Sequence, residues 1–557
     1  MAREKSLKKK KGDVWSLVSL GVIAMYGLIL IYPLFILLRQ SVFVGEGETR
    51  RFTLEAFRTF FSRPYYIETI FNSLKVTVTT TIITLIIGIP LAYFYQMYEI
   101  KGKSLLQILV ILCSMSAPFI GAYSWIVLLG RNGIISNFLH NVFGVQVGNI
   151  YGFKGIVLVL SLQLFPLVFL YLCGALKNID NSLLEASENM GCSGVKRFFK
   201  VVIPLCMPTI IAATLLVFMR AFADFGTPLL IGEGYQTFPV VIYDAYFNET
   251  GSDHTFGAAV SVIAIVITAI IFLVQRYINN RHRFTMNAMH TIERKQIHGL
   301  KAVLINFYCW FVVLLSFMPQ IYVIYSSFQK TSGKLFVEGY SLDSYRFAFS
   351  HLKKAIPNTF LIGAAALVLV VVLAILIAYL VVRRSSTANK AIDTISMIPY
   401  IIPGSVVGIA LVLAFNTKPL MLTGTATIMI LALIIRRIPY TIRSSVATLQ
   451  QIPMSIEEAS ISLGASKMKT FFRITVPMMG NGIMSGAILS WVTIITELST
   501  AIILYNLNTI TLTLAVYTYV SRGNYGIAAA YATILTVTTI ISLLIYMKVT
   551  GNKEVSL

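Results

Sequence analysis

Two carboxylates lie at matched places in otherwise apolar stretches of the chain. Asp224 belongs to the segment ADFGT (223–227), and Glu497 belongs to TELST (496–500), 273 positions later. Ionisable side chains are costly in apolar segments and usually face a polar cavity or a charged partner. Both residues are therefore candidates for lining a path taken by a polar solute. At about 1.5 Å per helical residue, Asp224 lies roughly 24 Å beyond Pro208, close to the outer end of its helix.

A local ion pair offers a second explanation for one of these carboxylates. Arg220 precedes Asp224 by one helical turn and could neutralise it. Glu497 has no such neighbour, because the equivalent position is Thr493. We therefore assign Asp224, Glu497 and Arg220 to a predicted translocation pathway, with the two carboxylates facing each other near its outer end.

The segment that follows Asp224 indicates the charge of the solute. No Lys or Arg occurs between Arg220 and Arg276, where tyrosines interleave with five acidic residues: Asp224, Glu233, Asp244, Glu249 and Asp253. Carboxylate and phenolate oxygens attract hard cations, so the pattern favours a cationic solute over an anionic one. The alternative is that extracytoplasmic loops are poor in basic residues whatever the solute.

The other polar residues do not predict an enzyme. Neither a Ser/His/Asp set nor a pair of carboxylates lies outside the apolar segments. Gly102-Lys103-Ser104 resembles the end of a phosphate-binding loop, but Met97 stands where that loop requires a glycine. We therefore expect no catalytic residues and no cofactor in this chain.

Cysteine and histidine usage does not predict a metal site. The five cysteines show no CxxC spacing and mostly lie in apolar segments, which predicts buried thiols without disulfides. His282, His290 and His298 recur at eight-residue steps in a basic stretch, 276–301. That stretch is more typical of a solvated connector. We assign no metal ligand.

A polar motif occurs twice, again 273 positions apart. Each copy is a Glu-Ala-Ser tripeptide followed at fixed intervals by a glycine and a proline: Glu185, Ala186, Ser187, Gly191 and Pro204, then Glu458, Ala459, Ser460, Gly464 and Pro477. The spacing predicts a short helix, a turn made possible by glycine, and a second segment ended by proline. A polar hairpin between apolar spans cannot cross lipid, so we interpret it as a docking element at the membrane surface.

Composition and hydropathy define the rest of the architecture. The chain is 57% hydrophobic and only 12% charged, which predicts an all-α polytopic membrane protein. We expect twelve spans near 14–38, 70–96, 105–129, 152–176, 209–231, 256–276, 303–327, 357–382, 390–416, 424–446, 479–505 and 525–548. The first span is too long for a signal-peptide core, so we expect it to be retained.

The duplication extends beyond the loops and sets the domain organisation. Asn72, Ala92 and Tyr93 reappear 286 positions later as Asn358, Ala378 and Tyr379. We predict two tandem six-helix repeats, 1–293 and 294–557, with loops at 177–208 and 450–481. The net charge of +22 gathers in short segments between spans, which predicts cytoplasmic loops and termini and excludes a nucleic-acid partner.

The two polar loops resemble the EAA loop of ABC-importer permeases, and the chain resembles the fused ferric-iron branch of that family throughout its length. Ser187 and Ser460 depart from the motif, which has a third alanine there. The resemblance implies the type I ABC importer fold in a bacterial cytoplasmic (inner) membrane. It also implies that both loops couple to two copies of a cytoplasmic ATP-binding subunit, which bind ATP and Mg.

The same resemblance implies an extracytoplasmic substrate-binding protein and ferric iron as the solute. Relatives in that branch carry 2-aminoethylphosphonate, thiamine or polyamines, and these remain alternatives. The implied coupling residues are the Glu, Ala, Gly and Pro of each motif: Glu185, Ala186, Gly191, Pro204, Glu458, Ala459, Gly464 and Pro477. An ion-coupled secondary carrier would also show repeats and buried carboxylates, but it would not need two such loops.

Overall fold

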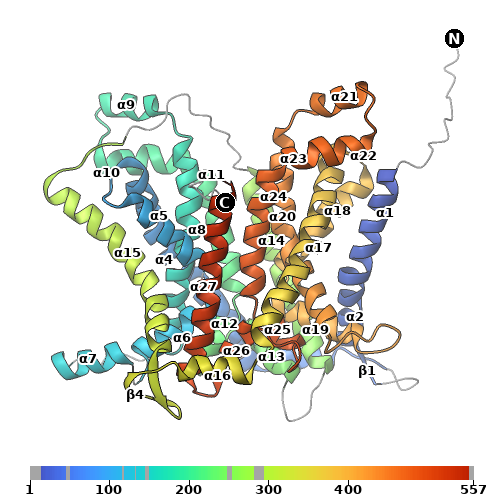
Figure 1. Cartoon of the computed structure of the whole chain (residues 1–557), viewed down its shortest axis with the longest axis horizontal. Helices are drawn as coiled ribbons and strands as arrows, with labels where there is room; N and C mark the ends of the chain where they lie inside the picture. The colour runs from blue at the N-terminus through green and yellow to red at the C-terminus, as the bar shows by residue number, and fades with distance from the viewer. Residues whose placement is uncertain are drawn as a thin grey trace.

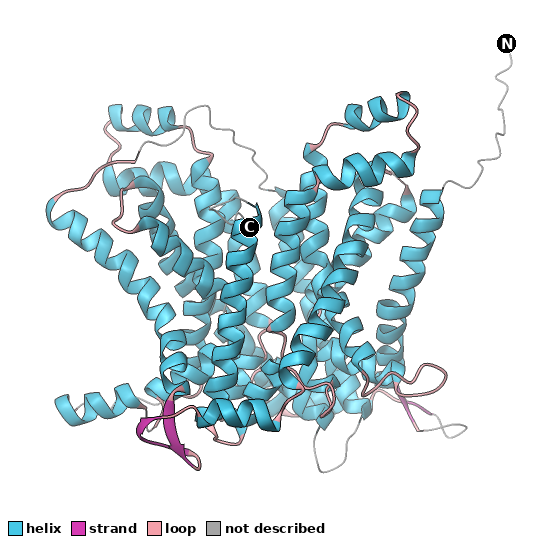
Figure 2. Cartoon of the chain, in the orientation of Figure 1, coloured by secondary structure: helices cyan, strands magenta, loops and turns pink. Residues whose placement is uncertain are grey.

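The structure, a computed structural model, describes residues 14–45, 51–115, 118–131, 133–144, 150–247, 254–281, 294–384 and 386–550. Within these ranges the chain is almost entirely helical (Figure 2). Two antiparallel hairpins follow the first long helix of each half: β1 (Phe43–Val44) with β2 (Arg51–Phe52), and β3 (Gln329–Ser332) with β4 (Leu335–Tyr340).

Corresponding helices occur in the same order along the chain in the two halves. The first half contains α1 (Val14–Tyr26), the π-helical turn η1 (Gly27–Ile31), α2 (Tyr32–Val42), α3 (Glu55–Ser62), α4 (Pro64–Met97), α5 (Lys103–Met115), α6 (Pro118–Leu129), α7 (Ile134–Phe143), α8 (Phe153–Lys177), α9 (Asn181–Asn189), α10 (Gly194–Arg197), the π-helical turn η3 (Phe198–Val202), α11 (Ile203–Phe222), α12 (Gly226–Ile231), α13 (Phe238–Phe247) and α14 (His254–Arg281). The second half contains α15 (Gly299–Ser327), α16 (Asp343–His351), α17 (Ala355–Arg383), α18 (Thr387–Ile401), α19 (Gly404–Phe415), α20 (Ala426–Gln451), α21 (Met454–Ser462), α22 (Lys467–Thr470), the π-helical turn η4 (Phe471–Thr475), α23 (Val476–Met478), α24 (Gly480–Ile495), α25 (Ala501–Leu504), α26 (Leu512–Ser521) and α27 (Tyr525–Thr550).

A helix occupies each of the twelve predicted spans. In the described residues, eight helices are long and apolar enough to cross a bilayer, and three bent helix pairs raise that number to eleven. The remaining predicted span, 424–446, corresponds to α20. That helix has the length of a span, but arginines at 436, 437 and 443 interrupt its apolar sequence.

Some spans predicted as continuous are broken. Span 105–129 bends by 102° between α5 and α6, and span 390–416 bends by 110° between α18 and α19. In the second case Pro403 disfavours helical geometry at Ile402, whose φ and ψ are −75° and 130°. Spans 209–231 and 479–505 also leave the helix early, after Phe222 and Ile495.

The molecule has two dissimilar ends (Figure 1). The helices of the two repeated loops, α9 and α21, lie at one end, with the start of α1 and the end of α27 toward the same side. The short helices α6, α7, α12, α13, α16, α19, α25 and α26 gather toward the opposite end, together with both hairpins. The long helices between the two ends hold most of the buried apolar side chains.

The first long helix of each half packs against the other half (Figure 1). On α1, the Trp15 ring lies 4.3 Å from that of Tyr379 on α17, and the Ser19 hydroxyl donates to Asn389 Oδ1 on α18 at 2.9 Å. On α15, the Tyr308 hydroxyl donates to the Ile87 carbonyl of α4 at 2.9 Å. Neither sequence repeat is therefore a separate bundle, because each completes its packing with a helix of the other.

Within the first half, α4 and α8 approach closely at a glycine. A Cβ added at Gly88 would lie 2.8 Å from Val168 Cβ, which is closer than real Cβ atoms approach other atoms. Gly174 on α8, in contrast, has no atom within 4 Å of such a Cβ. The small residue at 88 thus sets the separation of two spans.

We expect Gly88→Ala to destabilise the protein by about 1–3 kcal/mol, because the added methyl group forces α4 and α8 apart. Gly174→Ala is the matched control and should be neutral or slightly stabilising, since alanine favours helix and meets no neighbour there. Thermal unfolding of the purified variants in mild detergent measures both effects. Equal unfolding temperatures for Gly88→Ala and wild type would show that the contact is not tight.

Candidate functional site

The two repeated loops have the same structure element by element. In the first loop, α9 leads through a turn to α10, η3 and the next long helix, and α21, α22 and η4 follow the same course 273 positions later. The Asp180 carboxylate caps α9 by accepting a hydrogen bond from the Ser182 amide at 3.0 Å. The caps are the exception to this match, because in the second loop the capped helix is α22, where Ser466 accepts from the Lys469 amide at 3.3 Å. The predicted helix, glycine turn and second segment are therefore present in both copies.

Gly191 and Gly464 end the first helix of each loop in the left-handed region, with φ of +76° and +88°. The amides that follow turn back onto the helix: Cys192 N donates to Ser187 O at 2.8 Å, and Ala465 N donates to Ser460 O at 3.1 Å. This is a left-handed helix cap, which favours glycine because a Cβ is strained in that conformation. A Cβ would meet no other atom at either position, so the requirement is conformational only.

The prolines do not end the second segment, as the sequence pattern had suggested. Pro204 and Pro477 lie in the first turn of α11 and α23, and a π-helical turn joins each to the helix before it. The wider turn leaves out a hydrogen bond, so the missing proline N–H costs nothing there. Each loop therefore continues as a helix toward the membrane span.

The predicted coupling residues of both loops lie at the surface. The carboxylates Glu185 and Glu458 are exposed, and so are the neighbouring alanines, both glycines and both prolines: Ala186, Ala459, Gly191, Gly464, Pro204 and Pro477. The serines at the third motif position point inward instead, where Ser187 bonds to Leu184 O at 2.8 Å and Ser460 to Thr470 Oγ1 at 2.9 Å.

Three matched pairs of exposed apolar side chains accompany these residues. Met190 and Leu463, directly before the glycines, are 80% and 90% exposed. The other two pairs, which share the loop surface, are Val195 with Met468 and Phe199 with Phe472. We call these six residues the apolar loop surface. An apolar residue directly before each glycine of a polar loop is the sequence signal that could have revealed this surface.

Matched aromatic contacts hold both loops on the bundle. The Phe198 ring lies 4.8 Å from Tyr93 in the first half, and the Phe471 ring lies 4.9 Å from Tyr379 in the second. Tyr93 and Tyr379 are the residues that identified the wider duplication. The repeat therefore preserved the contact between loop and span as well as the loop itself.

Ion pairs distinguish the two loops. Arg383 Nε donates to Glu457 Oε1 at 2.8 Å, and both side chains are buried, at 8% and 3% exposure. In the first loop Glu188 is exposed and pairs with Arg197 at 3.0 Å and with Lys295, before α15, at 2.6 Å. The hydrogen bond from Lys295 lowers the pKa of the Glu188 carboxyl below its usual value. The first loop is thus tied to the connector between the halves.

Asp224 and Glu497 serve as caps where two membrane helices are interrupted. Asp224 Oδ2 accepts from the Thr227 amide at 3.0 Å, and Glu497 Oε1 accepts from the Thr500 amide at 3.1 Å. Each carboxylate therefore satisfies an amide at the start of the short helix that follows, α12 or α25. The two interruptions lie against each other, since a Cβ on Gly226 would lie 3.6 Å from Leu498 Cδ2.

The local ion pair considered as an alternative for Asp224 is not formed in the structure described, and Glu497, which has no basic residue one turn before it, has partners on a distant helix. Glu497 forms ion pairs with Arg437 and, at 3.8 Å, with Arg436, both on α20. Arg220 and Asp224, both in the described part of the chain, form no ion pair; the Arg220 guanidinium lies over the Tyr440 ring, 6.0 Å from its centroid. A sequence window around Glu497 could not reveal partners some sixty residues away.

The acidic surface expected after Asp224 is only partly present. Glu233 is neutralised by Arg131, whose Nη2 lies 2.6 Å from the Glu233 carboxylate. Glu249 and Asp253 lie outside the described residues, as do His282 and His290. Within the described ranges no three His, Cys, Asp or Glu side chains are grouped to hold a metal ion.

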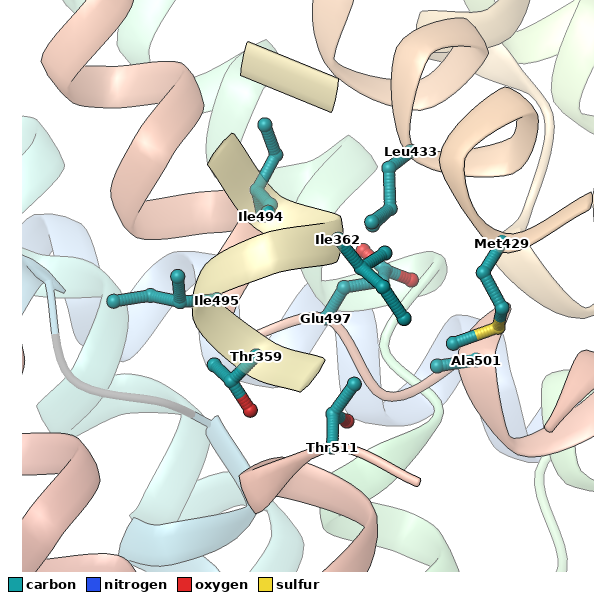
Figure 3. Close-up of a pocket in the computed structure, with 10 residues that line it drawn as sticks. Thr359, Ile362, Met429, Leu433, Ile494, Ile495, Glu497, Ala501 and Thr511 are labelled. Carbon is teal, nitrogen blue, oxygen red and sulfur yellow. The ribbon is translucent and has the colours of Figure 1, made fainter. Parts of the chain in front are cut away.

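A small pocket lies beside Glu497, inside the second half (Figure 3). Its lining is largely apolar, and Glu497 contributes its one carboxylate: Thr359, Ile362, Gly363, Met429, Leu433, Ile494, Ile495, Glu497, Ala501 and Thr511. These residues come from α17, α20, α24, α25 and the segment before α26, all of one half. The pocket is therefore not the predicted path between the halves.

We expect Glu497→Gln to destabilise the protein by about 3–5 kcal/mol, because it leaves a buried guanidinium without its counter-ion. Asp224→Asn should cost less than about 1 kcal/mol, since asparagine also accepts from an N-terminal amide. Chemical unfolding of the two purified variants in mild detergent, side by side, measures the difference. Equal losses, or a greater loss for Asp224→Asn, would contradict this assignment of partners.

Comparison with known proteins places the chain in a family. Residues 84–284 and 370–549 match the family described as "Binding-protein-dependent transport system inner membrane component". The chain is 28% identical to the ferric transport system permease protein of Actinobacillus pleuropneumoniae, over 99% of this chain and 80% of that protein. It is 30% identical to the molybdenum transport system permease protein of Haemophilus influenzae, over 38% of this chain and 91% of that protein.

A third relative is the spermidine/putrescine transport system permease protein PotB of Haemophilus influenzae, 31% identical over 40% of this chain and 78% of that protein. The family match occurs once in each half and includes both repeated loops. It also includes Asp224 and Glu497. The chain therefore belongs to the family of binding-protein-dependent transport system inner membrane components, as a fused permease with two copies of the family's membrane unit.

Proposed function

We propose that this permease imports ferric iron, driven by two ATP-binding subunits that dock on the repeated loops. The relative that aligns over 99% of the chain is a ferric transport permease, whereas the molybdenum and polyamine relatives align over less than half of it. In this arrangement a substrate-binding protein delivers the iron to the end of the molecule that carries the short helices.

The observation that carries the docking proposal is the apolar loop surface. Six matched apolar side chains are exposed on two polar loops, and these loops lie at one end of the molecule (Figure 1). Water-exposed apolar residues grouped in this way mark a protein interaction site. Because the surface occurs twice with the same geometry, it suits two copies of one partner.

The loops also have the mechanical connection that coupling requires. The first loop passes through a π-helical turn into the long helix α11, whereas the second passes through its π-helical turn into the short helix α23, which meets α24 at a bend of 68°. The helix that follows each loop, α11 or α24, ends at the interruption capped by Asp224 or Glu497, so a displacement of either loop would reach the place where the two halves meet. The proposed cytoplasmic side is the end of the molecule with the loops, which places both termini there as well.

The two loops should respond differently to the same displacement. In the second loop both partners of the Arg383–Glu457 pair are buried, whereas in the first the shared carboxylate of Glu188 is exposed, and of its two partners Arg197 is buried and Lys295 is exposed. Exposed ion pairs contribute little stability, and buried ones are costly to break. We infer that the second loop moves with its helix bundle as a rigid unit, while the first is less firmly held.

We expect Leu463→Asp and Met190→Asp to weaken association with the ATP-binding subunits at least tenfold, because a charge replaces the most exposed apolar side chain of each loop. Gly464→Val should have a smaller effect, through strain of about 1–3 kcal/mol at its left-handed φ. Copurification of tagged permease with its ATP-binding subunits is the measurement.

Leu335→Asp is the matched control, because Leu335 is 73% exposed but lies on the hairpin at the opposite end. That variant should retain the ATP-binding subunits in full. If the loop variants copurify as well as the control, the docking site is elsewhere.

The iron assignment is tested by uptake of radiolabelled ferric ion into proteoliposomes that contain the assembled transporter and its binding protein. Accumulation should require ATP and should stop when the ATP-binding subunits are omitted. Accumulation driven by an ion gradient without those subunits would indicate a secondary carrier instead. Saturable uptake of spermidine with no uptake of iron would assign the permease to a polyamine.

A further inference from the structure

We propose that Arg220, Arg436 and Arg437 form a binding site for a small oxyanion in the middle of the membrane, between the two halves. These three residues are called the arginine cluster below. The proposal deepens the proposed function, since it concerns the form in which the solute crosses.

The cluster draws on both halves of the chain. Arg220 on α11 lies over the ring of Tyr440 on α20, and Tyr400 on α18 is close enough to interact with its charge. The Tyr400 and Tyr440 rings are 5.7 Å apart and meet edge to face. One helix of the first half and two of the second thus meet around aromatic hydroxyls and a guanidinium.

The other two arginines are neighbours on α20. Arg436 Nη1 donates to the Ile402 carbonyl at 3.0 Å, and Arg436 Nη2 donates to Ser499 Oγ at 3.5 Å. Arg437 pairs with Glu497 and contacts the Tyr440 hydroxyl. Their side chains are only 16% and 12% exposed. The Nε atoms of both are buried and have no hydrogen-bond partner within the structure described.

The cluster lies at one depth in the membrane. Arg436 precedes the end of α20 at Gln451 by fifteen residues, or about 22 Å, and Arg220 follows the start of α11 at Ile203 by seventeen residues, or about 25 Å. Both helices reach their loop at that end. Arg436 also follows the start of α20 at Ala426 by ten residues, or about 15 Å, so it lies well inside this helix from both ends.

Positive charge exceeds negative charge at this depth. The described side chains in ion-pair contact with the three guanidiniums include a single carboxylate, that of Glu497. Asp224, the other candidate, is directed to the Thr227 amide instead. Buried guanidiniums without counter-ions are costly, and ionisable residues inside membranes usually serve a polar path.

An oxyanion has the chemistry that completes the cluster. Guanidinium groups present planar forks of N–H donors that match carboxylate, phosphate and phosphonate oxygens, and the tyrosine hydroxyls can donate as well. An unliganded ferric ion, in contrast, would be repelled by the net positive charge that remains after Glu497 is counted. Two sources would provide the oxyanion: it could be the solute itself, or it could enter as a ligand of the ferric ion and give that complex negative charge.

The first experiment measures binding by the full-length permease in lipid nanodiscs. Inorganic phosphate, compared with chloride at the same ionic strength, should raise the unfolding temperature in a saturable way. Arg436→Gln and Arg220→Gln should weaken the apparent affinity at least tenfold, and Arg436→Lys should be intermediate, because lysine keeps the charge without the fork. Arg443→Gln is the matched control, an arginine on the same helix that pairs with Asp393 outside the cluster.

Arg220→Gln removes no ion pair, because the contacts of Arg220 named above are with tyrosines. A loss of phosphate binding in this variant is therefore not explained by a folding defect from an unpaired buried charge. A phosphate response that is absent from wild type, or equal in wild type and all cluster variants, would overturn the proposal.

The second experiment separates the two sources in proteoliposomes with the assembled transporter. Accumulation of radiolabelled phosphate in the absence of iron would show that the oxyanion is the solute, which supports the site and contradicts iron as the solute. Iron uptake that requires phosphate and falls in Arg436→Gln would support both proposals. Iron uptake that proceeds equally in chloride alone, with wild-type rates in the cluster variants, would overturn the oxyanion site and leave the iron proposal intact.

Discussion

The two interrupted membrane helices depend on a single type of hydrogen bond, from a backbone amide to a buried carboxylate. Wherever a helix stops inside a bilayer, its free N–H groups find no water and must be satisfied by the protein. Asp224 and Glu497 provide that acceptor at equivalent positions. The interruptions allow α12 and α25 to turn away from the spans before them, and the two interruptions lie against each other. Without these caps the short helices at that end could not be placed where they are.

Glu497, the second capping carboxylate, also forms ion pairs with a neighbouring helix. Glu497 also balances Arg437 and Arg436, so one side chain fixes both the backbone at the interruption and the position of α20. Asp224 has only the backbone role in the first half, and the nearby Arg220 crosses to the aromatic rings of the second half. The repeat therefore preserved the cap but not the charge network around it. That asymmetry concentrates positive charge where the halves meet.

The exchange of first helices explains how two repeats make one transporter unit. Because α1 lies on the second half and α15 lies on the first, the long helices cannot separate without exposing buried side chains such as Trp15. The repeated loops lead into α11 in the first half and into the α23–α24 pair in the second. The exchange of α1 and α15 therefore keeps the two halves that carry the loops packed together.

The sequence by itself determined the class of protein, the twelve spans, the duplication and the shape of the repeated loops. These features follow from local signals: apolar run length, a motif at a fixed interval, and a glycine where a helix must end with positive φ. Asp224 and Glu497 could also be identified from the sequence, because a carboxylate within an apolar segment is easily recognised there. Tertiary structure alone decided their partners. Glu497 pairs with α20 and Arg220 packs on Tyr440, since charges in low-dielectric surroundings pair with whichever group the fold brings near, however distant in the chain. The sharp bends within the spans and the exchange of α1 and α15 also depend on packing between distant helices, and hydropathy carries no information about that.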